Sequence, residues 1–157
     1  MQVLYSDEPV FPGGLSIFLA GPTPRNKETK SWRPDAIQIL KDLGFEGTVI
    51  VPERRDWSVK FDYTDQVDWE FAGLSCSTVI VFWVPRDMTT MPALTTNVEF
   101  GFWIALDSAK VAYGRPDNAA SVRYLDWVYT QLAGKEPINT LAETLRAAVE
   151  LAAARIA

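Results

Sequence analysis

The sequence contains no histidine, and this absence excludes more chemistry than any other feature of its composition. Ser-His-Asp and Cys-His catalysis both need an imidazole, and the common zinc sites depend on histidine or on several cysteines. Only one cysteine, Cys76, is present, so an intrachain disulfide is impossible and a reducing compartment is expected. Any proton transfer must therefore fall to Asp, Glu, Tyr or Lys.

Long apolar runs and clustered positive charge are also missing. The longest strongly apolar run, Val79 to Val84, is far too short to cross a bilayer. The first residues lack the basic start and the long apolar segment of a signal peptide, so we expect a cytoplasmic protein with no membrane partner. The net charge is −5 and no basic run occurs, which argues against nucleic acid as a partner. A small phosphorylated ligand, met by one or two arginines, stays possible.

What is present is an alternation of apolar runs and helical periodicity over 157 residues, which predicts one domain spanning 1–157. The predicted strands are 15–20, 48–51, 78–84 and 110–113, and the predicted helices are 34–43, 66–75, 98–107, 121–132 and 140–156. This alternation indicates an α/β fold with a parallel sheet and helices on both faces. Ligands of such sheets bind beyond the carboxyl ends of the strands, in loops that here read AGPTPR, PERRDW, PRDMTTMPALTTN and YGRPDN.

Glu99 is the first candidate for chemistry. It stands in the segment TTNVEFGFW among apolar or small residues, where a solvated face has little room. With Asn97 as the N-cap, Glu99 lies in the first helical turn, where the helix dipole would keep it ionised. Gly101 in the helix interior suggests a close approach by another group, since glycine there costs roughly 1 kcal/mol relative to alanine. The ordinary interpretation is a dipole-complementing acid; the functional one is a nucleophile.

Glu70 is the second candidate. On the helix 66–75 it falls beside the apolar stripe formed by Val67, Phe71 and Leu74, whereas Asp68 points away. A core-facing glutamate could simply pair with a buried arginine. Left unpaired, burial would raise its pKa and suit it to share a proton with a substrate.

Two carboxylates from different elements, aimed at one cleft, match the general plan of glycosidic bond cleavage. One carboxylate attacks the anomeric carbon, and the other handles a proton. Weaker signals come from Arg25 and Arg86, which could meet a phosphate, and from Trp83, which could stack on a base. For each of these three, ordinary surface or core placement is the commoner explanation.

The motifs AGPTPR, WEFAGLSCSTVIVFWVPRD and TTNVEFG resemble the nucleoside 2-deoxyribosyltransferase family, over about Ile17 to Tyr113. The resemblance implies a flavodoxin-like, doubly wound parallel sheet of about five strands. It further implies an enzyme that cleaves the N-glycosidic bond of a (deoxy)nucleoside and transfers the deoxyribosyl group to another base. By this likeness Glu99 is the nucleophile that forms a covalent sugar intermediate, and Glu70 contacts the base in a place where aspartate is more familiar.

The same resemblance assigns further residues and partners. Ala20, Gly21, Pro22 and Thr23 resemble the floor of the sugar site, and the resemblance suggests that Asp87 and Asn97 contact the deoxyribose or support the nucleophile. The implied partners are a nucleoside or nucleotide, a free base and further copies of the chain that share active sites. No cofactor or metal is expected.

Several alternatives stay open at this point. Related proteins hydrolyse nucleoside 5′-monophosphates instead of exchanging bases, and Arg25 or Arg86 could supply the phosphate pocket. A nucleotide-binding module without catalysis is the rival from another class. A flavodoxin-type electron carrier and a receiver domain share the architecture. The sequence lacks the Ser/Thr-rich phosphate loop that the first would need, and the acids and the lysine that the second would need.

Overall fold

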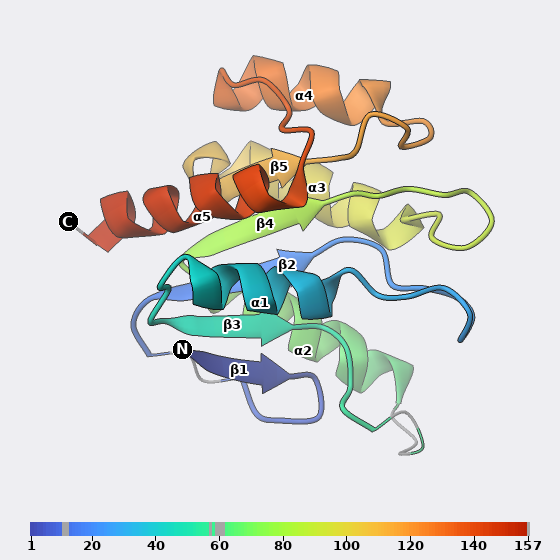
Figure 1. Ribbon diagram of the computed structural model, residues 1–157, viewed down its shortest axis with the longest axis vertical. Helices are drawn as coiled ribbons and strands as arrows, with labels where there is room; N and C mark the ends of the chain where they lie inside the picture. Colours follow the sequence, from blue (N-terminus) through green and yellow to red (C-terminus); the bar gives the residue numbers. More distant parts are fainter. Residues whose placement is uncertain (11–12, 57, 59–61, 157) are drawn as a thin grey trace.

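The computed structural model contains one five-stranded sheet in which every pairing is parallel (Figure 1). It describes residues 1–10, 13–56, 58 and 62–156; Trp57, at the end of the second ligand-side loop, lies outside the described residues. The elements follow the order β1 Gln2–Tyr5, β2 Ser16–Ala20, α1 Arg33–Asp42, β3 Thr48–Val51, α2 Tyr63–Cys76, β4 Val79–Trp83, α3 Leu94–Leu106, η1 Ser108–Lys110, β5 Val111–Gly114, α4 Arg123–Ala133 and α5 Leu141–Ile156.

The strand order is β1-β3-β2-β4-β5. Strands β3, β2, β4 and β5 reproduce the flavodoxin-like order 2-1-3-4, while the fifth strand, β1, is added at the outer edge beside β3. The predicted α/β, flavodoxin-like fold is therefore confirmed. The strand β1 was not foreseen, because QVLY is short and has a partly exposed burial pattern.

Helices cover both faces of the sheet, as predicted. One face packs against α1 and α5 through residues such as Leu19, Val81, Leu40 and Ala148. The opposite face packs against α2, α3 and α4, and Figure 1 shows these helices behind and above the sheet. Strands β2 and β4 are buried at every position, as expected of continuous apolar runs in a parallel sheet.

The helices α1 and α4 both end just before a glycine. Gly44 and Gly134 both take left-handed backbone conformations directly after these helices, which is the common way for a helix to stop. At the start of α2, the Asp62 side chain accepts a hydrogen bond from the Thr64 N–H at 2.7 Å.

The helix α3 departs from the prediction at its start. It begins at Leu94, after the left-handed residue Ala93, and Asn97 lies inside the helix instead of capping it. Glu99 is consequently in the second turn, so the expected dipole stabilisation of its charge in the first turn is wrong. The residues around it are also less enclosed than expected, since Val98 is 72% exposed. Nothing lies within 4 Å of the position that a Gly101 Cβ would take, so the expected close approach is absent among the described residues.

The apolar stripe predicted for α2 is also only partly buried. Leu74 lies in the core, but Val67 and Phe71 are 42% and 54% exposed. The helix approaches the sheet through Gly73, where a Cβ would lie 2.7 Å from Phe18 Cε2. This contact places the N-terminal half of the stripe toward the outside. Asp68 is exposed, as predicted.

Among the described residues, no helix is both long enough and apolar enough to cross a bilayer.

Candidate active site

A cavity of about 270 Å³ opens beyond the carboxyl end of β2, beside the end of β3 and the loop that leads into α3. This is the edge at which ligands of open α/β sheets bind, next to the point where the strand order reverses between β2 and β4. Its walls come from the loop after β2, the first half of α2 and the start of α3.

Both candidate carboxylates line this cavity. On α2 the lining residues are Tyr63, Gln66, Val67 and Glu70, whose spacing of three, one and three places them on one helix face. On α3 the lining residues are Leu94, Thr95, Thr96 and Glu99. Two neighbouring helices therefore each present one glutamate to the same space.

The Glu99 carboxyl group is mostly buried, and its electrostatics differ from the sequence-based expectation. Burial raises its pKa, the negative charge of Glu70 raises it further, and the positive charge of Arg33 opposes both, with the pKa reaching about 8. Burial dominates because removing a carboxylate from water disfavours its charged form. Near neutral pH the proton is thus expected to sit on Glu99.

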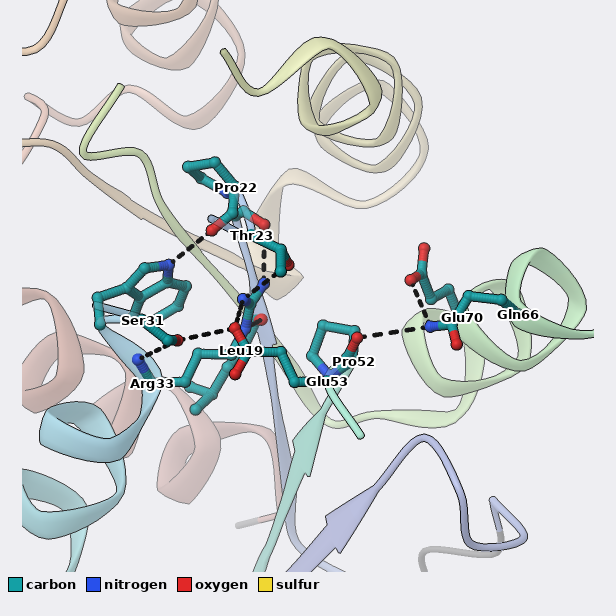
Figure 2. A network of polar contacts seen from close by, with 11 residues as sticks. Leu19, Pro22, Thr23, Ser31, Arg33, Pro52, Glu53, Gln66 and Glu70 are labelled. Atoms are coloured by element: carbon teal, nitrogen blue, oxygen red, sulfur yellow. Dashed lines mark hydrogen bonds and ion pairs between the residues drawn. The ribbon is translucent and has the colours of Figure 1, made fainter. Parts of the chain in front are cut away.

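The Glu70 carboxyl group also has a raised pKa, but two neighbouring groups oppose the rise. Burial raises its pKa as well, but Gln66 Nε2 donates a hydrogen bond to Glu70 Oε1 at 2.7 Å, and Arg33 adds a positive charge; both lower the pKa. Figure 2 shows this Gln66–Glu70 pair at the side of the network around Arg33. The two carboxyl groups differ in their surroundings, which is how paired acids acquire different protonation states.

The floor of the cavity requires a glycine at position 21. Gly21 has φ of +147°, and a Cβ there would lie 2.2 Å from the Trp83 carbonyl oxygen and 2.9 Å from Trp32 Cζ2. Trp32 in turn donates a hydrogen bond from Nε1 to the Pro22 carbonyl oxygen at 3.1 Å. The backbone of the loop after β2 therefore lies directly on β4 and on the start of α1.

A buried arginine, Arg33, holds this loop from below (Figure 2). Its Nε donates to the Leu19 carbonyl oxygen at 3.1 Å, and its Nη2 donates to the Gly21 carbonyl oxygen at 2.7 Å. Its Nη1 donates both to Thr23 Oγ1 at 3.0 Å and to Glu53 Oε1 at 2.6 Å. The side chain of Arg33 is 1% exposed and that of Glu53 13%, so this ion pair is largely removed from solvent.

Seven of the eleven residues singled out from the sequence line the cavity, and four do not. The lining set is Ala20, Gly21, Pro22, Thr23, Arg25, Glu70 and Glu99. Outside it are Trp83, Arg86, Asp87 and Asn97. The Trp83 side chain packs in the core between the sheet and the layer of α1 and α5, so in this chain it does not offer a stacking surface to the cavity.

The other three outlying residues hold the chain beside the cavity. Arg86 Nη1 donates to the Ser121 carbonyl oxygen at 2.7 Å, and its Nη2 donates to Asn97 Oδ1. Asp87 Oδ1 accepts hydrogen bonds from the backbone N–H groups of Thr89 and Thr90, at 2.9 and 2.8 Å. These hydrogen bonds fix the loop after β4 against the segment before α4 and against α3, whereas Arg86 Nε is buried without a hydrogen-bond partner among the described residues.

Sequence reasoning missed Arg33, Glu53 and Gln66. Glu53 lies in a loop that the strand order marks as ligand-side, which is a usable signal. Arg33 follows Trp32 at the start of a helix, and no periodicity indicates that such an arginine is buried. Gln66 was placed at the start of the predicted helix, whereas the helix begins at Tyr63 and Gln66 already faces the cavity.

The sequence matches the family described as nucleoside 2-deoxyribosyltransferase-like over residues 14–117. The chain belongs to this family. The match covers the loop after β2, Arg33, Glu53, Glu70 and Glu99, so the whole cavity described above lies inside it. No curated protein matches the sequence significantly.

The family assignment confirms the resemblance seen in the motifs and gives the general activity class, which is that of enzymes acting on nucleosides. Among residues 1–10, 13–56, 58 and 62–156, no three Cys, Asp or Glu side chains are grouped as ligands of a metal ion would be. The polar side chains that line the cavity carry two carboxyl groups, several hydroxyl groups, one amide group and two guanidinium groups.

Proposed function

We propose that this protein cleaves the N-glycosidic bond of a (deoxy)nucleoside and transfers the deoxyribosyl group to a second base, with retention through a covalent Glu99–sugar intermediate. The observation that carries the proposal is the pair of carboxyl groups on α2 and α3, facing one cavity in a chain of this family. Retaining cleavage of a glycosidic bond uses two such groups, one as nucleophile and one for proton transfer.

The raised pKa of both groups supports a state with one proton and one negative charge in the pair. Such a state matches the needs of the reaction, which are an anionic nucleophile beside the sugar and a proton donor beside the base. Burial favours the proton on Glu99, so the mechanism requires that this proton pass to Glu70 when the substrate binds. The base, lying against Glu70, is the group that then receives it.

In the first half-reaction a Glu99 carboxylate oxygen bonds to the anomeric carbon while the bond from that carbon to the base nitrogen breaks. The electron pair stays on the nitrogen, and the Glu70 proton neutralises the departing base. In the second half-reaction a nitrogen of the incoming base attacks the anomeric carbon. The Glu99 oxygen leaves with its electrons, and the proton of the incoming N–H group returns to Glu70.

Hydrolysis of nucleoside 5′-monophosphates is the second candidate, and a specific feature favours it. A second cleft adjoins the cavity and shares Thr23 and Arg25 with it, and Lys27 also lines it. Two cations beside the sugar site suit a phosphate group. In this case water replaces the second base as the attacking group.

We also propose that copies of this chain associate through the exposed faces of α2 and α3. The α2–α3 strip, defined by exposed apolar residues four apart on each helix, consists of Tyr63, Val67, Phe71, Leu94, Val98, Phe102 and Leu106. Phe71 and Phe102 join its two halves, with ring centroids 6.0 Å apart. Large contiguous apolar patches mark interaction surfaces, and three members of this one also line the cavity. A second copy seated on the strip would therefore border the site.

The test is chromatographic. The protein is incubated with nucleosides, deoxynucleosides and their 5′-monophosphates, each with and without a second free base. Product that forms only with the acceptor base supports the transferase, and free base released without an acceptor supports the hydrolase. Intact-mass measurement after incubation with a deoxynucleoside should reveal a protein heavier by one deoxyribosyl group.

Glu99→Gln removes the nucleophile with almost no change in shape, and Glu150→Gln, on the exposed side of α5, is its matched control. Glu99→Gln is expected to lose both turnover and the mass adduct, whereas Glu150→Gln retains both. Saturable nucleoside binding without turnover by the wild-type protein would instead favour a non-catalytic binding module.

A further inference from the structure

Arg33 lines the cavity and Glu53 lines the adjoining cleft, but neither side chain takes part in the bond changes proposed above. Arg33 starts α1 and Glu53 follows β3, so the pair connects the carboxyl ends of two strands to a helix on the opposite face of the sheet. Breaking a buried ion pair by removing one partner leaves an uncompensated charge, which is costly. An apolar contact at this buried position would avoid that cost, so the presence of an ion pair indicates a role beyond packing.

We propose that the Arg33–Glu53 ion pair is the positioning element of this site, holding the loop that floors the cavity and setting the charge that the Glu70 and Glu99 carboxyl groups experience. For its catalytic meaning this inference rests on the proposed function. The placement itself rests on hydrogen bonds and burial.

The positioning role follows from the direction of the hydrogen bonds. Arg33 donates hydrogen bonds to the carbonyl oxygens of Leu19 and Gly21 and to the hydroxyl oxygen of Thr23, which follow one another from the end of β2 into the loop. Because Thr23 Oγ1 accepts a bond from the guanidinium group, its own hydrogen is left to donate elsewhere. Thr23 lines both the cavity and the adjoining cleft, so that donor is available to a bound ligand.

Glu53 fixes the orientation of the arginine. Glu53 Oε1 accepts from Arg33 Nη1 and also from Ser31 Oγ at 2.7 Å, and the Ser31 hydroxyl oxygen accepts from the Arg33 backbone N–H at 3.2 Å (Figure 2). A planar guanidinium group held in this way delivers its remaining N–H groups in fixed directions.

The charge-setting role follows from the cavity itself, because Arg33 lines it together with Glu70 and Glu99. The positive charge of Arg33 lowers the pKa of both Glu70 and Glu99. The other titratable groups that line the cavity are Arg25, from the loop after β2, and Tyr63, from α2. Glu53 offsets part of the Arg33 charge, so this ion pair determines how much positive potential reaches the carboxyl groups.

The two roles can be separated by two substitutions. Glu53→Gln keeps the shape of the pair and removes the negative charge, whereas Arg33→Lys keeps the positive charge and removes the fork of hydrogen bonds. Asp107→Asn is the control, because Asp107 forms an ion pair with Arg155, at 2.7 Å, at the far end of α3. None of these three residues takes part in the bond changes proposed above.

The measurement is a ¹³C NMR titration of the side-chain carboxyl groups in glutamate-labelled protein, with Glu70→Gln and Glu99→Gln to assign the signals. Glu53→Gln should lower the pH at which the pair releases its proton by about one unit, the lower end of what a neighbouring charge produces. Arg33→Lys should titrate close to wild type but show faster amide hydrogen exchange in residues 20–25 and a raised KM with a smaller change in kcat. Asp107→Asn should change neither property.

A Glu53→Gln titration curve that coincides with wild type would overturn the charge-setting role. Unchanged exchange and unchanged KM in Arg33→Lys would overturn the positioning role. Should Arg33→Lys fail to fold, the titration of Glu53→Gln still decides the charge-setting role. For the positioning role, a comparison of Thr23→Val with Thr23→Ser decides whether the hydroxyl group that Arg33 holds contributes to KM. The titration needs no turnover, so its result stands apart from the outcome of the nucleoside assays.

Discussion

Glu99 and Glu70 face the same cavity but differ in what surrounds each carboxyl group. Burial raises the pKa of both, but Glu70 also accepts a hydrogen bond from Gln66, whereas Glu99 has the negative charge of Glu70 beside it. Glu99 is thus the member of the pair that keeps its proton to higher pH, with a pKa of about 8. The lone acid in an apolar helix correctly indicated a residue that lines the cavity. The predicted helix start, which would have kept Glu99 ionised, was wrong.

The pH dependence of kcat/KM tests this difference. Above pH 8 both carboxyl groups are ionised and no proton donor remains, so activity should fall with an alkaline limb near pH 8. Well below that pH both groups are protonated and the nucleophile is lost. The expected profile is bell-shaped in the wild-type protein. An alkaline limb that persists unchanged in Glu70→Gln, at whatever activity remains, would show that another group supplies the proton.

Substitution of Glu99 gives the second residue-scale prediction. Glu99→Gln should reduce turnover by roughly 10³-fold or more, because the nucleophile of a double displacement has no substitute in the cavity. Glu150→Gln should stay within about twofold of wild type. Steady-state rates with the best nucleoside donor provide the measurement, and wild-type rates in Glu99→Gln would rule out the covalent route.

The close packing around Gly21 leads to a prediction about the stability of the fold. A Cβ at this position overlaps the Trp83 carbonyl oxygen, so Gly21→Ala should lower the free energy of unfolding by roughly 2–4 kcal/mol. Gly101→Ala is the matched comparison, since its Cβ meets nothing within 4 Å, and it should raise that free energy by up to about 1 kcal/mol. Urea denaturation of both variants measures the difference, and similar values for the two would contradict the close packing of the loop on β4.

At the scale of the elements, α2 and α3 each have two faces with different roles. One face presents a glutamate to the cavity, and the next presents part of the α2–α3 strip. Periodicity identified both helices, but it could not tell which apolar residues face the sheet and which face outward. Val67 and Phe71 share a stripe with Leu74, and only the approach of the helix at Gly73 decides that Leu74 alone is buried.

The strip leads to a prediction about association. Val98 is 72% exposed in the middle of the α3 half, so Val98→Asp should shift the protein from oligomer to monomer. The physical reason is that a buried unpaired carboxylate at an interface costs several kcal/mol, whereas an exposed one costs little. Light scattering coupled to size exclusion measures the mass. Leu132→Asp, on the exposed side of α4, is the control and should leave the mass unchanged.

At the scale of the whole molecule, the paired carboxyl groups couple the stability of the fold to pH. In the unfolded chain Glu99 loses its proton near its ordinary value of 4.5, but in the folded chain it keeps the proton to about pH 8. The folded state binds more protons in this window, so the free energy of unfolding should fall as pH rises from 4.5 to 8 and then level off. Glu70 contributes in the same direction.

The prediction is that Glu99→Gln is more stable than wild type at pH 8.5, by roughly a few kcal/mol, and that the difference shrinks toward pH 5. Denaturant midpoints at several pH values measure it. A difference that is constant across this range would mean that Glu99 titrates in the folded protein as it does in the unfolded chain.

The architecture was predictable because its core strands are continuous apolar runs separated by helical periodicity. The ligand-side edge was predictable for the same reason, since parallel strands all end on one side. The strand β1 could not be foreseen, because four residues at the edge of a sheet leave little pattern. Nor could the buried Arg33, whose surroundings exist only once β2, β3 and α1 have come together.

The pairing of β1 has a consequence for the order in which the chain can assemble. The strands β1 and β2 follow one another in the sequence but never pair with each other; β3 lies between them and pairs with both. During synthesis neither of the first two strands can pair with any neighbour in the sheet until Thr48–Val51 has left the ribosome. Pairing in the sheet therefore cannot begin before the third strand has been synthesised. A pause in translation before this strand would leave β1 and β2 with unpaired backbone groups and without their common partner.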